Sequence, residues 1–547
     1  MPAAASLSDA LLAELRAAVG EAHVLTGADA IERHSRCTLP WASRCAAVVL
    51  PGSAQEVAQV LRLAAEHRVP VWPYSTGRNW GYGATLAPDS GAIVLLLARM
   101  DRILAVNEEL AYAVVEPGVT YAQLYAHLQA HGHRLWIDCI DGTPHGSVVG
   151  NALDRGVGET PYGDHFGNLC GLEVALASGE IVRVGGAGER TWHLHKWGVG
   201  PYLEGLFSQS NLGVVTRAGI WLMPAPEAYN AFVFELFDAR RFPAAIDAFR
   251  RLALAGVVTA KLHMINDVVS LSLITQVRDE GLPTDAALTA AQLAALTAKY
   301  RLAPWSCGGG LYGTAAQVRL QRRLLTDALG RYGRLQFLDA RRLALLERLT
   351  AAAGRHPWLR RPVERLAGAS LPVMRAAPHI YDVLRGVPTE HFVRHAWFRN
   401  RRPRPEAGID PAADGCGLIW FAPILPMHGA EVESYLADCT RRFAAHGFDF
   451  YCALLLMNPR AVIALMAILY DRDAQGQAER ARALHDELTA AMQAAGYQPY
   501  RAGLLTWPRL WAGAPALAAL NGRLKAALDP AGAIAPGRYG IGASPVE

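Results

Sequence analysis

From about residue 46 to 220, short apolar runs alternate with helical periods, and this alternation limits the possible folds more than any other feature of the chain. The runs "AAVVLP" and "VPVWPY" have the length and β-branched content of strands, whereas "AQEVAQVLRLAAEH" between them repeats apolar residues at helical spacing. Short connections between such elements are typical of α/β architecture. The pattern predicts helices packed on a sheet in this part of the chain.

The character of the sequence changes at about residue 229. Long helical stretches such as "RLQRRLLTDALGRYG" are then interleaved with strand-like runs such as "GLIWFAPILP". A chain of 547 residues is too long for one ordinary core. We therefore predict an α+β protein of two domains, residues 1–228 completed by the tail 500–547, and residues 229–499. Residues 399–415 are predicted to be a flexible loop with solvated arginines.

The composition favours a folded, globular protein without a nucleic-acid or membrane surface. Hydrophobic residues make up 52% of the chain and charged residues 19%, and the net charge of +4 is spread along the sequence. The N-terminal segment has Asp9 and Glu14 where a signal peptide needs apolar residues, so we predict an amphipathic helix capped by Ser6 or Ser8. We therefore expect a cytoplasmic protein.

Cysteine and histidine do not follow a metal-binding pattern. The 8 cysteines are scattered without CxxC spacing, and the 18 histidines show no ligand spacing. We expect buried thiols in a reducing compartment and no metal site.

The stretch "PYSTGRNWGYGAT", residues 73–85, places three glycines directly after an apolar run. Unpaired backbone N–H groups in such a turn can form a nest for phosphate oxygens, and Arg78 could add a charge-assisted hydrogen bond. The spacing GxxxGxG matches neither the Rossmann fingerprint nor the P-loop, so a plain turn between a strand and a helix is the alternative. Tyr82, between two of the glycines, either lines a pocket or faces solvent.

Tyr500 and Arg501 are neighbours in "GYQPYRAG", at a corner where both side chains can turn towards one cleft. A guanidinium beside a phenol suits stabilisation of a phenolate, and a surface ion pair of Arg501 is the alternative. Asp138, Asp141 and His145 lie close together in "LWIDCIDGTPHGSVVGN". The aspartates could act as a base or stabilise a cation, but any of the three could also belong to an ordinary turn.

Taken together, these stretches resemble the flavoprotein family of vanillyl-alcohol oxidase, eugenol oxidase and the flavoprotein subunit of p-cresol methylhydroxylase. The similarity extends from about "CAAVVLPGSAQEV" to "APGRYGIG" and includes "STGRNWGYG", "VVEPGVTY", "GSVVGNALDRGVGETPYGDHFG", "GPYLEGLFSQSNLGVVTRAGIWLMP" and "IWFAPILP". The resemblance implies a two-domain flavoprotein. Its first domain, with the tail, would be a FAD-binding domain of the p-cresol methylhydroxylase type, and the second an α+β cap over the substrate.

By this resemblance, "STGRNWGYG" runs along the FAD pyrophosphate, other segments line the dinucleotide, and Arg538 approaches the flavin ring. The residues expected to bind FAD are Ser75, Thr76, Gly77, Arg78, Asn79, Gly81, Pro117, Gly118, Gly150, Asn151, Gly156, Gly158, Thr160, Tyr162, Gly163, Asp164, His165, Asn211, Gly213, Val215 and Arg538.

This chain differs from the family at the positions that form a covalent bond to FAD. The oxidases attach FAD to a histidine at the position of Leu418, so that bond cannot form. The tyrosine that p-cresol methylhydroxylase uses falls near His395, which is the alternative anchor. We expect FAD to be held without a covalent bond.

Tyr82, Tyr500 and Arg501 match the family positions that hold the oxygen of a para-substituted phenol, and Asp141 matches the aspartate that vanillyl-alcohol oxidase places near the flavin. The resemblance implies that a hydride leaves the benzylic carbon to give a quinone methide, followed by hydroxylation, oxidation, desaturation or oxidative decarboxylation. The segment "DGTPHGS" departs from the family's glycine-rich version, which makes His145 a candidate pocket residue.

The resemblance also implies that O2 or a cytochrome accepts the electrons and that the protein is a homodimer. Two other functions are open at this point. One is a flavin oxidase of the same fold that acts on an alditol or a 2-hydroxy acid, and the other is a flavin-binding protein without turnover. The matches at Tyr82, Tyr500 and Arg501 argue against both.

Overall fold

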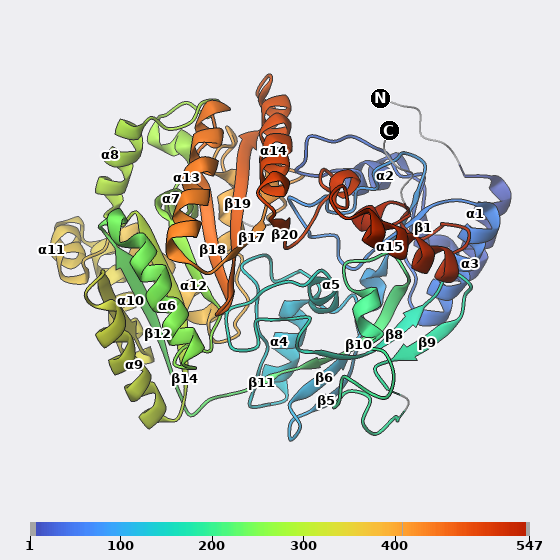
Figure 1. The fold of residues 1–547 in the computed structure, drawn as a ribbon, viewed down its shortest axis with the longest axis horizontal. Helices are drawn as coiled ribbons and strands as arrows, with labels where there is room; N and C mark the ends of the chain where they lie inside the picture. Colours follow the sequence, from blue (N-terminus) through green and yellow to red (C-terminus); the bar gives the residue numbers. More distant parts are fainter. Residues whose placement is uncertain (1–6, 187, 407, 543–547) are drawn as a thin grey trace.

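The computed structural model describes residues 7–186, 188–406 and 408–542 (Figure 1). Its strands form a four-stranded sheet of order β1-β2-β4-β3, a five-stranded sheet of order β5-β6-β10-β8-β9, a two-stranded pair and a nine-stranded sheet. The two smaller sheets and the nine-stranded sheet occupy opposite halves of the molecule in Figure 1. The mixture of helices and sheets confirms the predicted α+β class.

The smaller sheets come from the N-terminal part of the chain. Their strands are β1 (Val24–Leu25), β2 (Ala47–Val49), β3 (Val71–Tyr74), β4 (Ile93–Leu96), β5 (Ile103–Asn107), β6 (Tyr112–Val115), β8 (Leu169–Ala175), β9 (Ile181–Val184) and β10 (Val214–Trp221), and the separate pair is β7 (Leu135–Trp136) with β11 (Met223–Pro224). The helices here are α1 (Asp9–Val19), α2 (Ala28–His34), α3 (Ala54–His67), α4 (Tyr121–Ala130) and α5 (Val148–Leu153).

Helix α3 shows why these segments fold as they do. The Ser53 side chain accepts a hydrogen bond from the Glu56 backbone N–H and so caps the first turn. Val57, Val60, Leu61 and Ala64 follow at helical spacing, and all are buried in the core. Ser8 caps α1 in the same way, which confirms the predicted N-terminal helix.

The nine-stranded sheet has the order β15-β12-β14-β13-β18-β19-β17-β20, and β16 also pairs with β19. Its strands are β12 (Ala228–Leu236), β13 (Leu262–Asn266), β14 (Trp305–Gly313), β15 (Arg334–Leu338), β16 (Cys416–Phe421), β17 (Pro423–Pro426), β18 (Tyr451–Asn458), β19 (Ala461–Asp471) and β20 (Gln498–Pro499). The helices between them are α6 (Phe242–Leu254), α7 (Asp267–Ile274), α8 (Ala290–Tyr300), α9 (Ala315–Leu329), α10 (Ala340–Arg355), α11 (Pro357–Ala367), α12 (Leu371–Val383), α13 (Gly429–Ala445) and α14 (Gln477–Ala494).

The two faces of this sheet have different neighbours. Helices α6, α9, α13 and α14 lie over one face in Figure 1. Because side chains alternate along a strand, Leu262 and Met264 of β13 pack in the hydrophobic core, while His263 and Ile265 point the other way into a cavity. The sheet therefore presents alternate residues of its central strands to that cavity.

The C-terminal tail returns to the first small sheet. The Val71 N–H donates to the Ala533 carbonyl over 2.8 Å, and the Ala535 N–H donates to the Val71 carbonyl over 2.8 Å. Helix α15 (Pro515–Leu528) precedes this contact. The tail thus lies beside β3, as the sequence predicts, whereas the domain boundaries themselves stay a prediction.

The described residues settle two further points. All eight cysteines are buried and none forms a disulfide, which agrees with the predicted buried thiols. Among the helices of the described ranges, none is long and apolar enough to cross a membrane.

The prediction of solvated arginines in residues 399–415 is wrong for Arg399. Its side chain is 4% exposed and pairs with Asp449, and it also donates to the Pro283 carbonyl over 3.1 Å. Arg402, by contrast, is half exposed and pairs with Asp473 at the surface. The charge pattern could not separate the two arginines, because only the packing around them decides which one is buried.

Arg399→Met is expected to lower the free energy of unfolding by about 3–5 kcal/mol, because it leaves the buried Asp449 carboxylate without its cation. Thermal and urea denaturation of the purified protein measure this loss. The matched variant Arg402→Met removes an exposed pair and should leave the transition almost unchanged. Equal shifts in both variants would contradict the assignment of Arg399 as a buried structural cation.

Candidate active site

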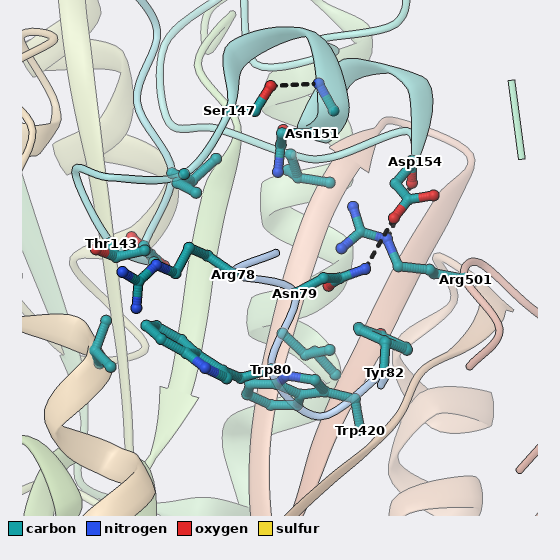
Figure 2. A pocket seen from close by; sticks show the side chains of 18 of the residues that line it. Arg78, Asn79, Trp80, Tyr82, Thr143, Ser147, Asn151, Asp154, Trp420 and Arg501 are labelled. Atoms are coloured by element: carbon teal, nitrogen blue, oxygen red, sulfur yellow. Dashed lines mark hydrogen bonds between the residues drawn. The ribbon is translucent and has the colours of Figure 1, made fainter. Parts of the chain in front are cut away.

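A cavity of about 460 Å³ lies where the glycine-rich turn, the nine-stranded sheet and the C-terminal tail meet. The turn contributes the stretch from Ser75 to Asn79, the tail contributes Arg538, and the sheet contributes residues of its central strands. Figure 2 shows Arg78 and Asn79 of the turn, Trp420 of β16 and Arg501 of the tail around a common space. Segments far apart in the sequence therefore build one site.

The glycine-rich turn follows β3 directly and lies along the cavity. Gly77 has φ +70, and a Cβ atom there would lie 2.3 Å from the Thr85 Cγ2 atom, so this position accepts only glycine without strain. Arg78 lies with its guanidinium 5.6 Å from the centre of the Trp80 ring and 3.6 Å from the Asp410 carboxylate. The turn thus combines a tight backbone, side-chain donors and a cation at the cavity.

The structure brings only part of the predicted FAD-binding set to the cavity. Those that line it are Ser75, Thr76, Gly77, Arg78, Asn79, Pro117, Gly150, Asn151, Gly213, Val215 and Arg538. Those that do not are Gly81, Gly118, Gly156, Gly158, Thr160, Tyr162, Gly163, Asp164, His165 and Asn211.

Several residues of the second group support the walls instead. The His165 ring lies 2.6 Å from the Asn151 Oδ1 atom and 2.8 Å from the Asp138 Oδ1 atom. The Asn211 amide donates to the Ala535 carbonyl over 2.8 Å and so ties the tail to this region. Their predicted contact with the cofactor remains a prediction.

Tyr82, Tyr500 and Arg501 converge as predicted. The Arg501 guanidinium carbon is 5.3 Å from the centre of each tyrosine ring. The Tyr82 hydroxyl and the Arg501 Nη2 atom are both buried and have no hydrogen-bond partner among the described residues. Two buried donors therefore lack an acceptor at the same place.

Burial controls the charge of this group. It raises the pKa of Tyr82 and of Tyr500, and the nearby Arg501 cation opposes the rise without reversing it. Burial alone would lower the pKa of Arg501, but Tyr500 and Asp154 outweigh it and raise the value. At neutral pH the site thus offers two neutral phenols and one guanidinium, all of them donors.

Asp154 connects the cation to the turn, and its local sequence gave no separate signal. Its carboxylate accepts from the Asn79 amide over 2.8 Å and from the Tyr539 hydroxyl over 2.5 Å (Figure 2 shows the first). Its carbonyl accepts from the Arg501 Nε–H over 2.9 Å. The Gln209 side-chain amide donates to the carbonyls of both Asp154 and Tyr500. It thereby connects the start of the C-terminal tail to the loop that contains Asp154.

Asp141 lines the cavity together with two residues that sequence reasoning did not single out, Glu159 and His263. His263 Nδ1 lies 2.9 Å from an Asp141 oxygen and 3.1 Å from a Glu159 oxygen. Burial acts to raise the pKa of Asp141, but His263 holds that pKa below its usual value. Burial and the adjacent Asp141 raise the pKa of Glu159.

The other residues of this stretch lie elsewhere. Asp138 is buried and accepts from the Glu159 and Thr160 backbone N–H groups, so it shapes the loop. His145 has a side chain that is 62% exposed, near Glu390, and it does not line the cavity. The structure therefore gives no support to His145 as a pocket residue.

His395 and Leu418 both line the cavity. The His395 ring packs 5.3 Å from the Trp420 ring and 5.7 Å from the Tyr451 ring, and burial lowers the pKa of His395 to about 4. His395 Nε2 is buried without a hydrogen-bond partner among the described residues. His395 is thus a neutral imidazole in the wall.

The residues present fit FAD. The tight turn at Gly77 and the donors Ser75, Thr76 and Asn79 suit phosphate oxygens. The Arg538 Nε–H group is buried at the cavity and lacks a partner among the described residues, which suits an acceptor of the cofactor.

Comparison of the sequence with known proteins also indicates a flavoprotein. The family model described as "FAD binding domain" matches residues 45–185. The 1'-carboxy-chondrochloren decarboxylase of Chondromyces crocatus is 39% identical over 96% of both chains. The flavoprotein subunit of the 4-cresol dehydrogenase (hydroxylating) of Pseudomonas putida is 29% identical over 96% of this chain and 94% of its own.

Solved structures agree. The structure superposes on p-cresol methylhydroxylase with substrate bound at a TM-score of 0.86 and 28% identity, covering 97% of this chain and 96% of that one. It superposes on the 4-ethylphenol oxidase of Gulosibacter chungangensis at a TM-score of 0.87 and 26% identity, covering 99% of both. The chain therefore belongs to the FAD-dependent oxidoreductases of the vanillyl-alcohol oxidase and p-cresol methylhydroxylase family.

Proposed function

We propose that this protein removes a hydride from the benzylic carbon of a para-substituted phenol. The observation that carries the proposal is the pair of buried donors without acceptors, Tyr82 Oη and Arg501 Nη2. A buried donor without a partner costs about 1–3 kcal/mol, so a ligand oxygen that accepts from both is strongly favoured. A phenol oxygen is such an acceptor, and it gains most from these donors when it is ionised.

The residues of the site then favour the phenolate. The Arg501 guanidinium supplies a positive charge, and Tyr82 and Tyr500 supply neutral hydroxyl donors that lower the phenol's pKa by favouring its charged form. When the benzylic C–H bond breaks and its electron pair leaves as hydride, the phenolate becomes a neutral quinone methide. Bound FAD would supply the hydride acceptor. Tyr82, Tyr500 and Arg501, the phenol-binding trio, therefore stabilise the negative charge of the substrate's phenolate ring. The benzylic carbon that loses the hydride would lie further into the cavity.

We assign the FAD-binding domain to residues 1–228 with the tail 500–547 and the cap to residues 229–499. The assignment is supported by the tail's hydrogen bonds to Val71 and by the cavity-facing residues of the nine-stranded sheet. We further propose that the protein is a homodimer and that O2 or a cytochrome accepts the electrons. The similarity to a dehydrogenase and to an oxidase supports the two candidate acceptors.

The similarity to the decarboxylase of Chondromyces crocatus favours oxidative decarboxylation as the product-forming step. In this step a carboxylate on the carbon next to the benzylic carbon leaves as CO2. The electron pair of the broken C–C bond forms the side-chain alkene and restores the phenolate. The step needs no further oxidant after hydride loss.

Anaerobic titration of the holoenzyme tests the proposed function. Alkylphenols, 4-hydroxybenzyl alcohols and 4-hydroxyphenyl carboxylates are expected to bleach the oxidised flavin band, and their O-methyl ethers are expected to leave it unchanged. The ethers are the matched control because they keep the shape and lose the ionisable oxygen. Bleaching by a 2-hydroxy acid or an alditol instead would transfer the function to those substrates.

We expect FAD to be held without a covalent bond, because Leu418 offers no nucleophile and His395 is packed between aromatic rings. After acid precipitation, the yellow flavin should remain in the supernatant. Flavin in the pellet would contradict this, and loss of that colour in His395→Ala would then identify the anchor.

A further inference from the structure

Asp141, Glu159 and His263 form an acid–base cluster in the cavity wall, and the family resemblance accounts for Asp141 alone. The Glu159 side chain is buried, whereas the Asp141 side chain is 41% exposed towards the cavity. The three side chains come from the loop after β7, the loop after α5 and strand β13. Their polar atoms lie within 4.8 Å of one another. His263 Nδ1 makes a hydrogen bond to Asp141, whereas its 3.1 Å approach to Glu159 lacks hydrogen-bond geometry.

Glu159 is the member whose surroundings favour the protonated form. Its side chain is 6% exposed, and its Oε1 atom has no hydrogen-bond partner among the described residues. Adjacent negative charges disfavour ionisation of both carboxyl groups. Burial and the neighbouring Asp141 raise the pKa of Glu159, whereas His263 lowers the pKa of Asp141 against the effect of burial. This arrangement favours the negative charge on Asp141 and the proton on Glu159, with polar atoms of the two side chains within 4.8 Å of each other.

The cluster lies away from the phenol-binding trio along the sheet. His263 belongs to β13, and Tyr500 directly follows β20, with β18, β19 and β17 between these two strands. Cavity-facing Leu455 and Leu465 cover the space between them with apolar surface. Under the proposed function, a phenol held at Arg501 would extend its para substituent along this apolar surface towards the cluster.

We propose that Glu159 and His263 keep Asp141 as the proton acceptor for water that adds to the quinone methide, a role that rests on the proposed function. The water oxygen forms a bond to the benzylic carbon, and its O–H proton passes to the Asp141 carboxylate. The electron pair of the exocyclic double bond returns to the ring and restores the phenolate. Glu159 is the neutral donor to Asp141, and His263 is a positioning residue supplied by the nine-stranded sheet.

Product analysis with 4-ethylphenol tests the proposal on the holoenzyme. The wild type is expected to form 1-(4-hydroxyphenyl)ethanol, and Asp141→Asn is expected to form it about 100-fold more slowly, with 4-vinylphenol in its place. Glu159→Leu and His263→Leu should shift the products in the same direction, from the alcohol towards 4-vinylphenol. Absence of the alcohol from wild-type products, or an unchanged product ratio in both leucine variants, would overturn the proposal.

The conservative variants separate chemistry from folding. Glu159→Gln keeps a neutral donor to Asp141, and His263→Asn keeps a donor near the Nδ1 position, so both should retain the alcohol product. If Glu159 is instead an ionised group, Glu159→Gln will fail like Glu159→Leu. If no phenol reduces the flavin of the wild type, the proposed function fails first, and the inference falls with it.

Two readouts follow the proton itself. The infrared difference spectrum of wild type minus Glu159→Gln should show the C=O band of a protonated carboxylic acid. The rate of alcohol formation in the wild type should fall as the pH rises and Glu159 ionises, and this fall should be absent in Glu159→Gln. Other titratable groups face the cluster: Asp138 on the loop before it, Cys307 on β14, Tyr451 on β18 and His395. An alkaline limb that persists in Glu159→Gln, or a stoichiometric metal ion in the purified holoenzyme, would count against proton sharing.

Discussion

Arg501→Met is expected to slow the reduction of bound flavin by a 4-alkylphenol by about 10²–10³-fold, which corresponds to about 2.7–4 kcal/mol of lost stabilisation. The methionine keeps much of the packing volume but removes the buried charge that lies 5.3 Å from both tyrosine rings. The phenol then binds as the neutral form, from which hydride loss would leave a cationic product. Anaerobic stopped-flow absorbance of the flavin measures the rate directly.

The controls for this variant come from the same chain. Arg501→Lys keeps the charge but loses the planar fork, so it should recover only part of the rate. Arg323→Met removes an arginine whose side chain is 80% exposed on α9, far from the cavity lining, and should reduce at the wild-type rate. Reduction of Arg501→Met at that same rate would show that the phenol oxygen does not bind at Arg501.

Gly77→Ala is expected to weaken FAD binding by about 5- to 150-fold, because a left-handed backbone at a non-glycine residue costs about 1–3 kcal/mol. The new Cβ atom would also meet the Thr85 methyl group at 2.3 Å. Thr85 cannot rotate freely, since it is buried and its hydroxyl donates to the His34 carbonyl over 2.9 Å. The turn must therefore move, and the donors beside it move with it.

The ratio of flavin to protein absorbance after purification, followed by titration with added FAD, measures this effect. Gly522→Ala is the matched control: no atom lies within 4 Å of its built Cβ, and the position is inside α15. It should retain full flavin content. Gly77→Ala with full flavin content and unchanged FAD affinity would show that this turn does not hold the pyrophosphate.

Local signals in the sequence were sufficient where function depends on neighbours in the chain. The turn from Ser75 to Asn79 and the dipeptide Tyr500–Arg501 were both found this way, since each places its groups within a few residues. Glu159 lies in a recognised motif but has no local feature that marks it as protonated. His263 lies in "KLHMIN", where strand alternation alone does not tell which face becomes the cavity.

Apolar periodicity in the sequence predicted a mixture of helices and strands, and the motifs that carry the family resemblance identified the family and its FAD cofactor, because both are properties of neighbouring residues. The same resemblance supplied the proposal that Tyr82, Tyr500 and Arg501 bind a phenol. Tertiary structure decided the rest. It buried Arg399, left His145 at the surface, and brought His263 from the nine-stranded sheet onto Asp141 and Glu159. Burial and charge pairing depend on segments that meet only in the folded chain, and together they raise the pKa of Glu159 and lower that of Asp141.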